Sequence, residues 1–114
     1  MANNFVNKKV DITSAESAVT LYTIPSATTA IIKSILVSDA SGSGSSITIT
    51  VTTPLEAVFS VAYLKTISAN TPTEIITNPL IVETGEIVKV TAGSANRLHV
   101  ILSAMEVTPR TVTT

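Results

Sequence analysis

The sequence is poor in the residue types from which most catalytic and metal sites are built. Among its 114 residues it has no cysteine, no tryptophan and a single histidine. Without cysteine, disulfide bonds and thiolate metal sites are excluded. The four aromatic residues, Phe5, Tyr22, Phe59 and Tyr63, are few for a protein that stacks on nucleic-acid bases or on sugar rings.

Charge is also scarce. Charged residues make up 13% of the chain, and seven Lys and Arg are balanced by eight Asp and Glu, which gives a net charge of −1. Because the basic residues are scattered, they form no basic face, and we expect no nucleic-acid partner. Low charge together with a mean hydropathy of +0.47 leaves a surface poorly protected from association. We therefore expect partners to cover much of it.

Long apolar runs are missing as well. The first nine residues, MANNFVNKK, lack the apolar core of a signal peptide. No apolar run reaches the length needed to span a bilayer. We therefore expect a protein that is made in the cytoplasm and has no membrane partner.

What the chain has in excess is residues that favour β-strands. Thr, Val and Ile together make up about 39% of the sequence. About eight strand-like segments follow one another at roughly twelve-residue spacing, with no clear helix. This pattern predicts an all-β, single-domain antiparallel β-sandwich with jelly-roll or Greek-key-like connections. We expect the sandwich over residues 10–107, an N-terminal arm over 1–9 and a C-terminal tail over 108–114.

Two segments carry the clearest strand signals. Ile47–Thr53 alternates apolar and polar residues, as a half-buried strand does. Ala30–Ser38 is apolar on both faces, which predicts a strand that is covered twice, either within the fold or by another subunit. A helix is the alternative for this second segment, since its apolar residues also fit helical spacing, but its β-branched content favours the strand. The residues concerned are Ile31, Ile32, Ile35 and Leu36.

The turn Glu83–Glu86 separates two apolar runs, 79–82 and 87–90. Gly85 can take a positive φ there at low cost. The pattern predicts a β-hairpin, followed by a third antiparallel strand over 97–107. The loop 39–46, rich in Gly and Ser, is likewise expected to close a hairpin and to be flexible.

No group of residues predicts catalysis. His99 would need a nucleophile and an orienting acid, and the sequence marks neither. Glu83 and Glu86 are the only acids close together, and a solvated turn explains them better than a calcium site. We therefore expect no enzyme activity, no catalytic or metal residues and no cofactor.

Two further motifs have simple structural explanations. Gly42-Ser43-Gly44 has neither the Lys-Ser/Thr pair nor the helix start of a phosphate-binding loop. Lys8-Lys9 is too short to serve as a nucleic-acid arm. Tyr22 and Tyr63 are expected at the edge of the core.

Several short strand-and-turn segments follow one another in an order that resembles the segment order of small virion structural proteins of tailed bacteriophages, including phages of marine and cyanobacterial hosts. These segments are residues 21–25, 29–35, 78–86, 88–92 and 98–107. The resemblance implies a β-sandwich assembled on the particle, either as a head decoration (cement) protein or as a small part of a tail, fibre or head spike. It also implies a homotrimer.

The leading hypothesis is a capsid decoration protein in the virion, assembled in the host cytoplasm. It would bind the major capsid protein or another virion protein and stabilise the head lattice by non-covalent stapling, with residues 2–9 as an arm that orders on binding. The residues expected at the interface are Phe5, Val6, Ile31, Ile35 and Val37. The alternatives are a tail, fibre or head-spike module that binds a host surface, and a hydrolase that places His99 in a cleft beside a hydroxyl and a carboxylate.

Overall fold

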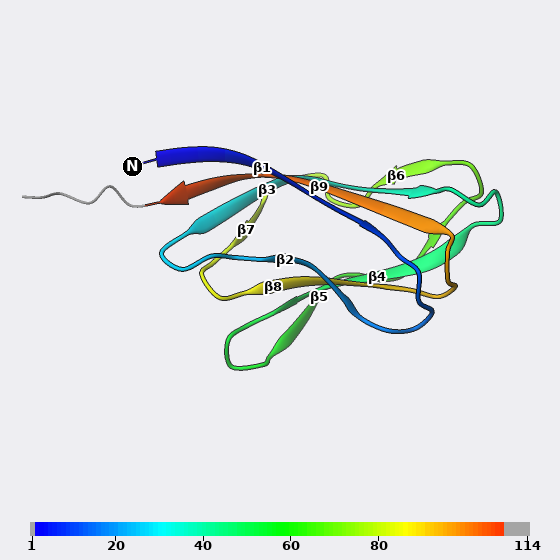
Figure 1. Ribbon diagram of the computed structural model, residues 1–114, viewed down its shortest axis with the longest axis horizontal. Coiled ribbons are helices and arrows are strands. Elements are labelled where there is room, and N and C mark those ends of the chain that lie inside the picture. The colour runs from blue at the N-terminus through cyan, green and yellow to red at the C-terminus, as the bar shows by residue number, and fades with distance from the viewer. Residues whose placement is uncertain (1, 109–114) are drawn as a thin grey trace, which may run out of the picture.

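The computed structural model describes residues 2–108, and within them the chain is all β (Figure 1). Two antiparallel sheets face each other, as the sequence predicts. Sheet A has the strand order β1-β9-β3-β6, with β7 also paired to β3, and sheet B has the order β2-β8-β4-β5. The strands are β1 (Ala2–Asp11), β2 (Val19–Thr23), β3 (Thr29–Asp39), β4 (Ser45–Thr52), β5 (Val58–Ile67), β6 (Pro72–Glu74), β7 (Leu80–Val82), β8 (Ile87–Ala92) and β9 (Leu98–Thr108).

The core lies between the two sheets and is built from alternate residues of their central strands. The pattern over Ile47–Thr53 is confirmed, because every second side chain of β4 is buried. β8 and β9 alternate in the same way. Burying a Val, Leu or Ile side chain contributes about 1.5–3 kcal/mol, so these rows, which hold half of the buried hydrophobic residues, supply a large part of the driving force for folding. They are Ile47, Ile49 and Val51 of β4, Val88, Val90 and Ala92 of β8, and Leu98, Val100, Leu102 and Ala104 of β9.

Strand β3 contains a bulge that explains its ambiguous sequence pattern. Its pairing with β9 shifts register between Ile32 and Ser34, so one extra residue is inserted. Ile32 and Ile35 therefore both face the core, three positions apart, and Lys33 is exposed. This spacing of three is what imitates a helix. The prediction of a strand is confirmed.

The turn Glu83–Glu86 is not a hairpin, and that prediction was wrong. β7 pairs with β3 in sheet A, whereas β8 pairs with β2 and β4 in sheet B, so the turn carries the chain from one sheet to the other. Gly85 does take a positive φ of 81°. Its N–H donates to the carbonyl of Ile24 at 3.1 Å, and Thr84 Oγ1 accepts from Thr28 N at 3.0 Å. Contacts with the β2–β3 connection therefore hold the turn in addition to its own internal hydrogen bonds.

The loop after Asp39 also crosses between sheets, from β3 to β4, and closes no hairpin. Within the described residues, β4 and β5 are the one pair of consecutive strands that are hydrogen-bonded to each other. Alternating polarity shows that a segment is a strand, but it does not say which strand lies beside it. The partners here were therefore not predictable from the local pattern.

The N-terminal segment expected as an arm forms strand β1 of sheet A. It pairs with β9 without a break from Ala2↔Thr108 to Asp11↔His99. Val6 and Val10 pack against the core, which explains why this mostly polar segment is held in place. Of the expected tail over 108–114, Thr108 ends β9, and the other residues lie outside the described residues, as does Met1.

Candidate functional site

His99 lies on the outer face of sheet A, beside the end of β1. Its Nε2 is 3.3 Å from Asp11 Oδ1, and both side chains are exposed. The two residues share a shallow depression of about 320 Å³ with Lys9, Val10, Val100 and Ile101. A carboxylate is therefore present beside the imidazole, but no hydroxyl or thiol lines the depression. The hydrolase hypothesis requires that third group.

The acidic residues do not gather into a metal site within residues 2–108. No group of three or more His, Asp or Glu side chains is close enough together there to hold an ion. At the turn that contains the two nearest acids in the sequence, the Glu86 carboxylate accepts a hydrogen bond from Glu83 N at 2.7 Å. That carboxylate therefore stabilises the turn from within.

The loop after β3 is cross-linked by one side chain, although flexibility was expected. The Asp39 carboxylate accepts from Ser41 N at 2.9 Å, from Gly44 N at 3.1 Å and from Asn70 N at 3.0 Å. The Ser41 hydroxyl donates to it as well. These bonds, first of all that from the Ser41 hydroxyl, hold the pKa of the Asp39 carboxyl well below its usual range. The amides of Ser41 and Gly44 are thereby occupied, and the loop presents no phosphate cradle.

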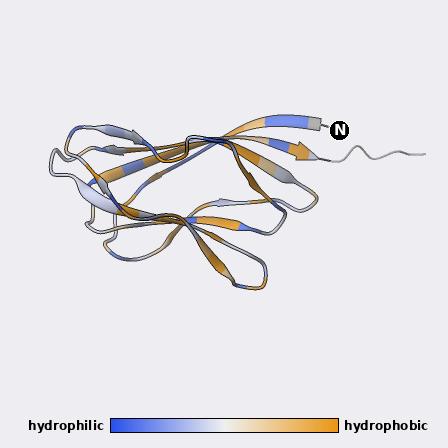
Figure 2. Cartoon of the chain, turned by 180° about the vertical axis from the view of Figure 1, so that it is seen from behind, coloured by the Kyte–Doolittle hydropathy of each residue, from blue (hydrophilic) through white to orange (hydrophobic). Residues whose placement is uncertain are grey.

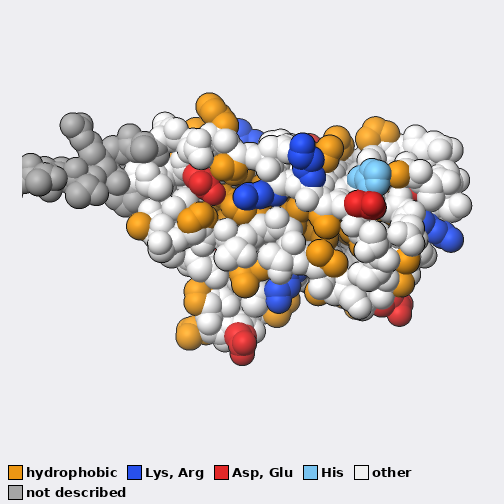
Figure 3. Space-filling view, in the orientation of Figure 1, with side chains coloured by type: hydrophobic (Ala, Val, Ile, Leu, Met, Phe, Trp, Pro, Cys, Tyr) orange, Lys and Arg blue, Asp and Glu red, His pale blue; other side chains and the backbone are white. Residues whose placement is uncertain are grey.

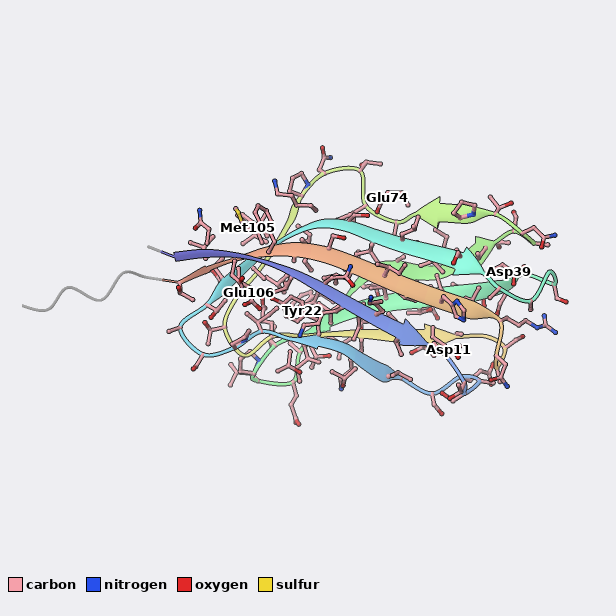
Figure 4. All side chains as sticks on the ribbon, turned by 45° about the horizontal axis from the view of Figure 1, so that its top comes forward. Asp11, Tyr22, Asp39, Glu74, Met105 and Glu106 are labelled. Carbon is pink, nitrogen blue, oxygen red and sulfur yellow. The ribbon has the colours of Figure 1, made fainter. Side chains whose placement is uncertain are left out.

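Tyr22 joins the two sheets on the β1–β2 side of the sandwich. Its ring is buried, as expected for a core-edge residue, and its hydroxyl donates to the Glu106 carboxylate of β9 (Figure 4). Lys8 of β1 lies with its Nζ 5.5 Å from the ring centroid. Burial and the neighbouring carboxylate raise the pKa of Tyr22 above its usual value. The Tyr22–Glu106 hydrogen bond therefore links sheet B to sheet A, and we interpret this cluster as structural.

The five residues expected at an interface divide into three groups. Phe5 is 79% exposed, and Ile31 is half-buried on the same outer face of sheet A. Ile35 and Val37 are fully buried in the core, so they cannot contact a partner, and that prediction was wrong. The bulge in β3 turns both of them inward. Val6 packs against the core from β1 and is partly covered.

Phe5 and Ile31 belong to a row of apolar side chains that crosses four strands of sheet A. Phe5 is paired with Met105, Met105 with Ile31, and Ile31 with Ile81. Directly paired residues of antiparallel strands project from the same face, so the four side chains lie side by side. Ile81 is 64% exposed. We call these four residues the sheet A row; Met105, near its middle, is labelled in Figure 4.

A second apolar surface lies on the β4–β5 hairpin, whose turn projects from the body of the sandwich (Figure 1). Figures 2 and 3 show hydrophobic residues along this projection. Of the eight large hydrophobic residues that are exposed within the described chain, five lie on this segment. We call these five the hairpin patch: Leu55, Val58, Phe59, Tyr63 and Leu64.

Sequence reasoning missed the hairpin patch. Tyr63 was predicted at the edge of the core, and that prediction was wrong, because its side chain is 72% exposed. β5 has apolar side chains on both faces, with Phe59 on the side of Val51 and Val58 on the opposite side. The signal was present, because apolar residues on both faces require either two covering layers or a partner. β5 is an edge strand and has neither within this chain.

Comparison with known proteins adds no relative. No family model matches the chain, and a search of curated proteins gives no significant match. The described residues include no helix that is long and apolar enough to cross a membrane.

Proposed function

We propose that the chain is a structural subunit of a bacteriophage particle, and specifically a capsid decoration protein that binds the head lattice. The observation that carries the proposal is the sheet A row, an apolar strip across four hydrogen-bonded strands on an outer face. The order of the strand and turn segments resembles that of small phage virion proteins. This resemblance is the reason for proposing the phage head lattice as the partner. Contiguous apolar surface of this kind is typical of proteins that work in an assembly.

The paired state of β1 supports a pre-formed docking surface instead of an arm that orders on binding. Phe5 is held in register by its pairing with Met105, and the row continues through Ile31 to Ile81. A pre-organised surface loses less conformational entropy when it binds. An interface of ordinary size covers about 800 Å² on each partner, and such a contact can add several kcal/mol of stability per subunit.

The test is to locate the chain on particles purified from the source of the sequence. Mass spectrometry of the particles shows whether the chain is present, and gold-labelled antibody seen by electron microscopy shows where. Label spread over the heads supports the proposal. Label confined to tails or fibres contradicts it and favours the attachment module, and absence of the chain from the particles contradicts both.

A further inference from the structure

We propose that the free edge of β1 pairs with β1 of a second copy of the chain, antiparallel and about a two-fold axis, so that the two copies of sheet A form one continuous sheet. β1 is the end strand of sheet A. The contact is made by backbone groups along this edge, whereas the proposed function uses side chains on the outer face of the sheet. The inference therefore goes beyond the proposed function and does not depend on it.

The first reason is that β1 differs from the other edges of the two sheets. Within the described residues, β2 and β5 end sheet B, and each pairs with its neighbour through a shift of register. The edge of sheet A opposite β1 is formed by β6 and β7, which have three residues each. Bulges and short strands blunt an edge against strand addition. β1 has ten residues and pairs with β9 without a shift, so it is the edge that can continue a sheet.

The second reason is the direction of the backbone groups. Ile12 N donates to Leu98 O at 3.1 Å, directly after the last paired residues of β1. Because the register is unbroken, even-numbered residues of β1 direct their N–H and C=O groups toward β9, and odd-numbered residues direct theirs away from it. Ala40 N donates to Arg97 O at 2.7 Å, which agrees, because odd-numbered residues of β9 then face β3. The outward-directed groups belong to Asn3, Phe5, Asn7, Lys9 and Asp11.

The third reason is that the edge is open. Of residues 3–11, seven are exposed, and only Val6 and Val10 are partly buried, against the core. No other strand within residues 2–108 pairs with this edge. A second strand would therefore find the outward N–H and C=O groups accessible, and main-chain hydrogen bonds are the source of affinity when a strand is added to a sheet.

The fourth reason is that the edge is complementary to itself. With Asn7 on the two-fold axis, all five outward-directed residues find partners of the same kind, which gives about ten hydrogen bonds between the two copies. Asn7 then lies opposite its own copy, Phe5 opposite Lys9, and Asn3 opposite Asp11. No like charges meet in this register. Moving the axis to Lys8 would place that lysine opposite its own copy, which is unfavourable.

The side chains of this register also fit. Directly paired residues project from the same face, so the aliphatic stem of Lys9 lies beside the Phe5 ring of the other copy. Phe5 is 79% exposed in the single chain. The Asn3 amide can donate a hydrogen bond to the Asp11 carboxylate across the axis. These contacts favour a second copy of this chain as the occupant of the edge.

The first experiment is sedimentation velocity of the full chain from about 1 to about 100 µM, without any particle. We expect the mass to rise from one copy to two. Asn7→Pro removes an outward-directed N–H, a change that edge strands tolerate, and should weaken association at least about tenfold. The matched control is Leu55→Ser/Ile81→Ser, which removes two exposed apolar side chains away from β1 and should leave the dimer unchanged.

The second experiment tests the register, since the chain has no cysteine of its own. In Asn7→Cys the two Cα atoms would lie about 5.5 Å apart across the axis, within the range of a disulfide. In the control Asn3→Cys, on the same face of β1, they would lie roughly 27 Å apart. With oxidised glutathione as the oxidant, Asn7→Cys should form disulfide-linked dimers at least about tenfold faster than Asn3→Cys.

Circular dichroism and thermal melting confirm that each variant is folded, and the cysteine pair keeps the test valid even where Asn7→Pro folds poorly. A chain that stays monomeric throughout, or a three-copy species, would overturn the two-fold pairing of β1. So would equal rates of cross-linking by the two cysteine variants, or equal weakening of the dimer by Leu55→Ser/Ile81→Ser and by a folded Asn7→Pro.

Discussion

At the scale of single residues, Asp39 illustrates how a short polar side chain can replace regular structure. Four hydrogen-bond donors converge on its carboxylate, from Ser41, Gly44 and Asn70. One side chain thus joins the β3–β4 loop to the turn before β6. The positive φ values of Gly42 and Gly44, 83° and 70°, let the loop bend around it.

The charge of Asp39 predicts a pH-dependent stability. Its pKa is lower in the folded protein than its ordinary value of 3.8, so ionised Asp39 stabilises the fold above about pH 4. That contribution decreases as the pH falls below this value and the carboxyl becomes protonated. Asp39→Asn should therefore lower the urea midpoint at about pH 7 and change it less at about pH 3.

Asp11→Asn is the matched control, because it removes the same charge from another carboxylate. Asp11 is exposed, and its ion pair within the described residues is with His99. This substitution should change the midpoint little. Equal midpoints for wild type and Asp39→Asn at the higher pH would show that the loop is not held by this carboxylate.

At the scale of elements, the edge of β3 shows why the strands were easier to predict than their partners. β6 pairs with one end of β3 and β7 with the other, and the segment around Ile35 lies between them. There the Glu74 carboxylate accepts from Ile35 N at 2.8 Å and also from the Ser34 hydroxyl. A side chain thus completes the edge where no strand is present (Figure 4).

Removing this carboxylate predicts a loss of stability. Glu74→Ala leaves the amide of Ile35, a residue fully buried in the core, without its acceptor. An unsatisfied buried amide costs about 1–3 kcal/mol, and we expect a decrease of that size in the free energy of unfolding measured by urea. Glu74→Gln keeps an acceptor oxygen and should lose less. If both variants lost the same small amount, the bond would not be structural.

The limits of prediction from the sequence follow from the range of each interaction. Alternation over Ile47–Thr53 depends on nearest neighbours, and it predicted the strand correctly. At Gly85 the chain crosses from one sheet to the other, and the turn is bonded there to Ile24 and Thr28. Because these two residues are distant in sequence, the local sequence pattern does not predict the crossing. For Ile35, a bulge of one residue decides between core and surface, and the sequence does not mark the bulge.

At the scale of the whole molecule, exposed apolar surface occurs on both sheets. The sheet A row runs from Phe5 to Ile81, and the hairpin patch projects from sheet B. The first and last strands, β1 and β9, pair along their full length, which makes the outer face of sheet A continuous. This arrangement suits a subunit that contacts the head lattice through the outer face of sheet A.

The central claim, that the sheet A row binds phage heads, is tested most directly by co-sedimentation of the full chain with purified heads that lack it. We predict that wild type binds and that Ile81→Asp, which places a charge in the apolar row, binds at least about tenfold more weakly. Thr20→Asp adds the same charge to an exposed position on sheet B and should bind like wild type. Failure of wild type to bind, or equal binding by all three, would contradict the account.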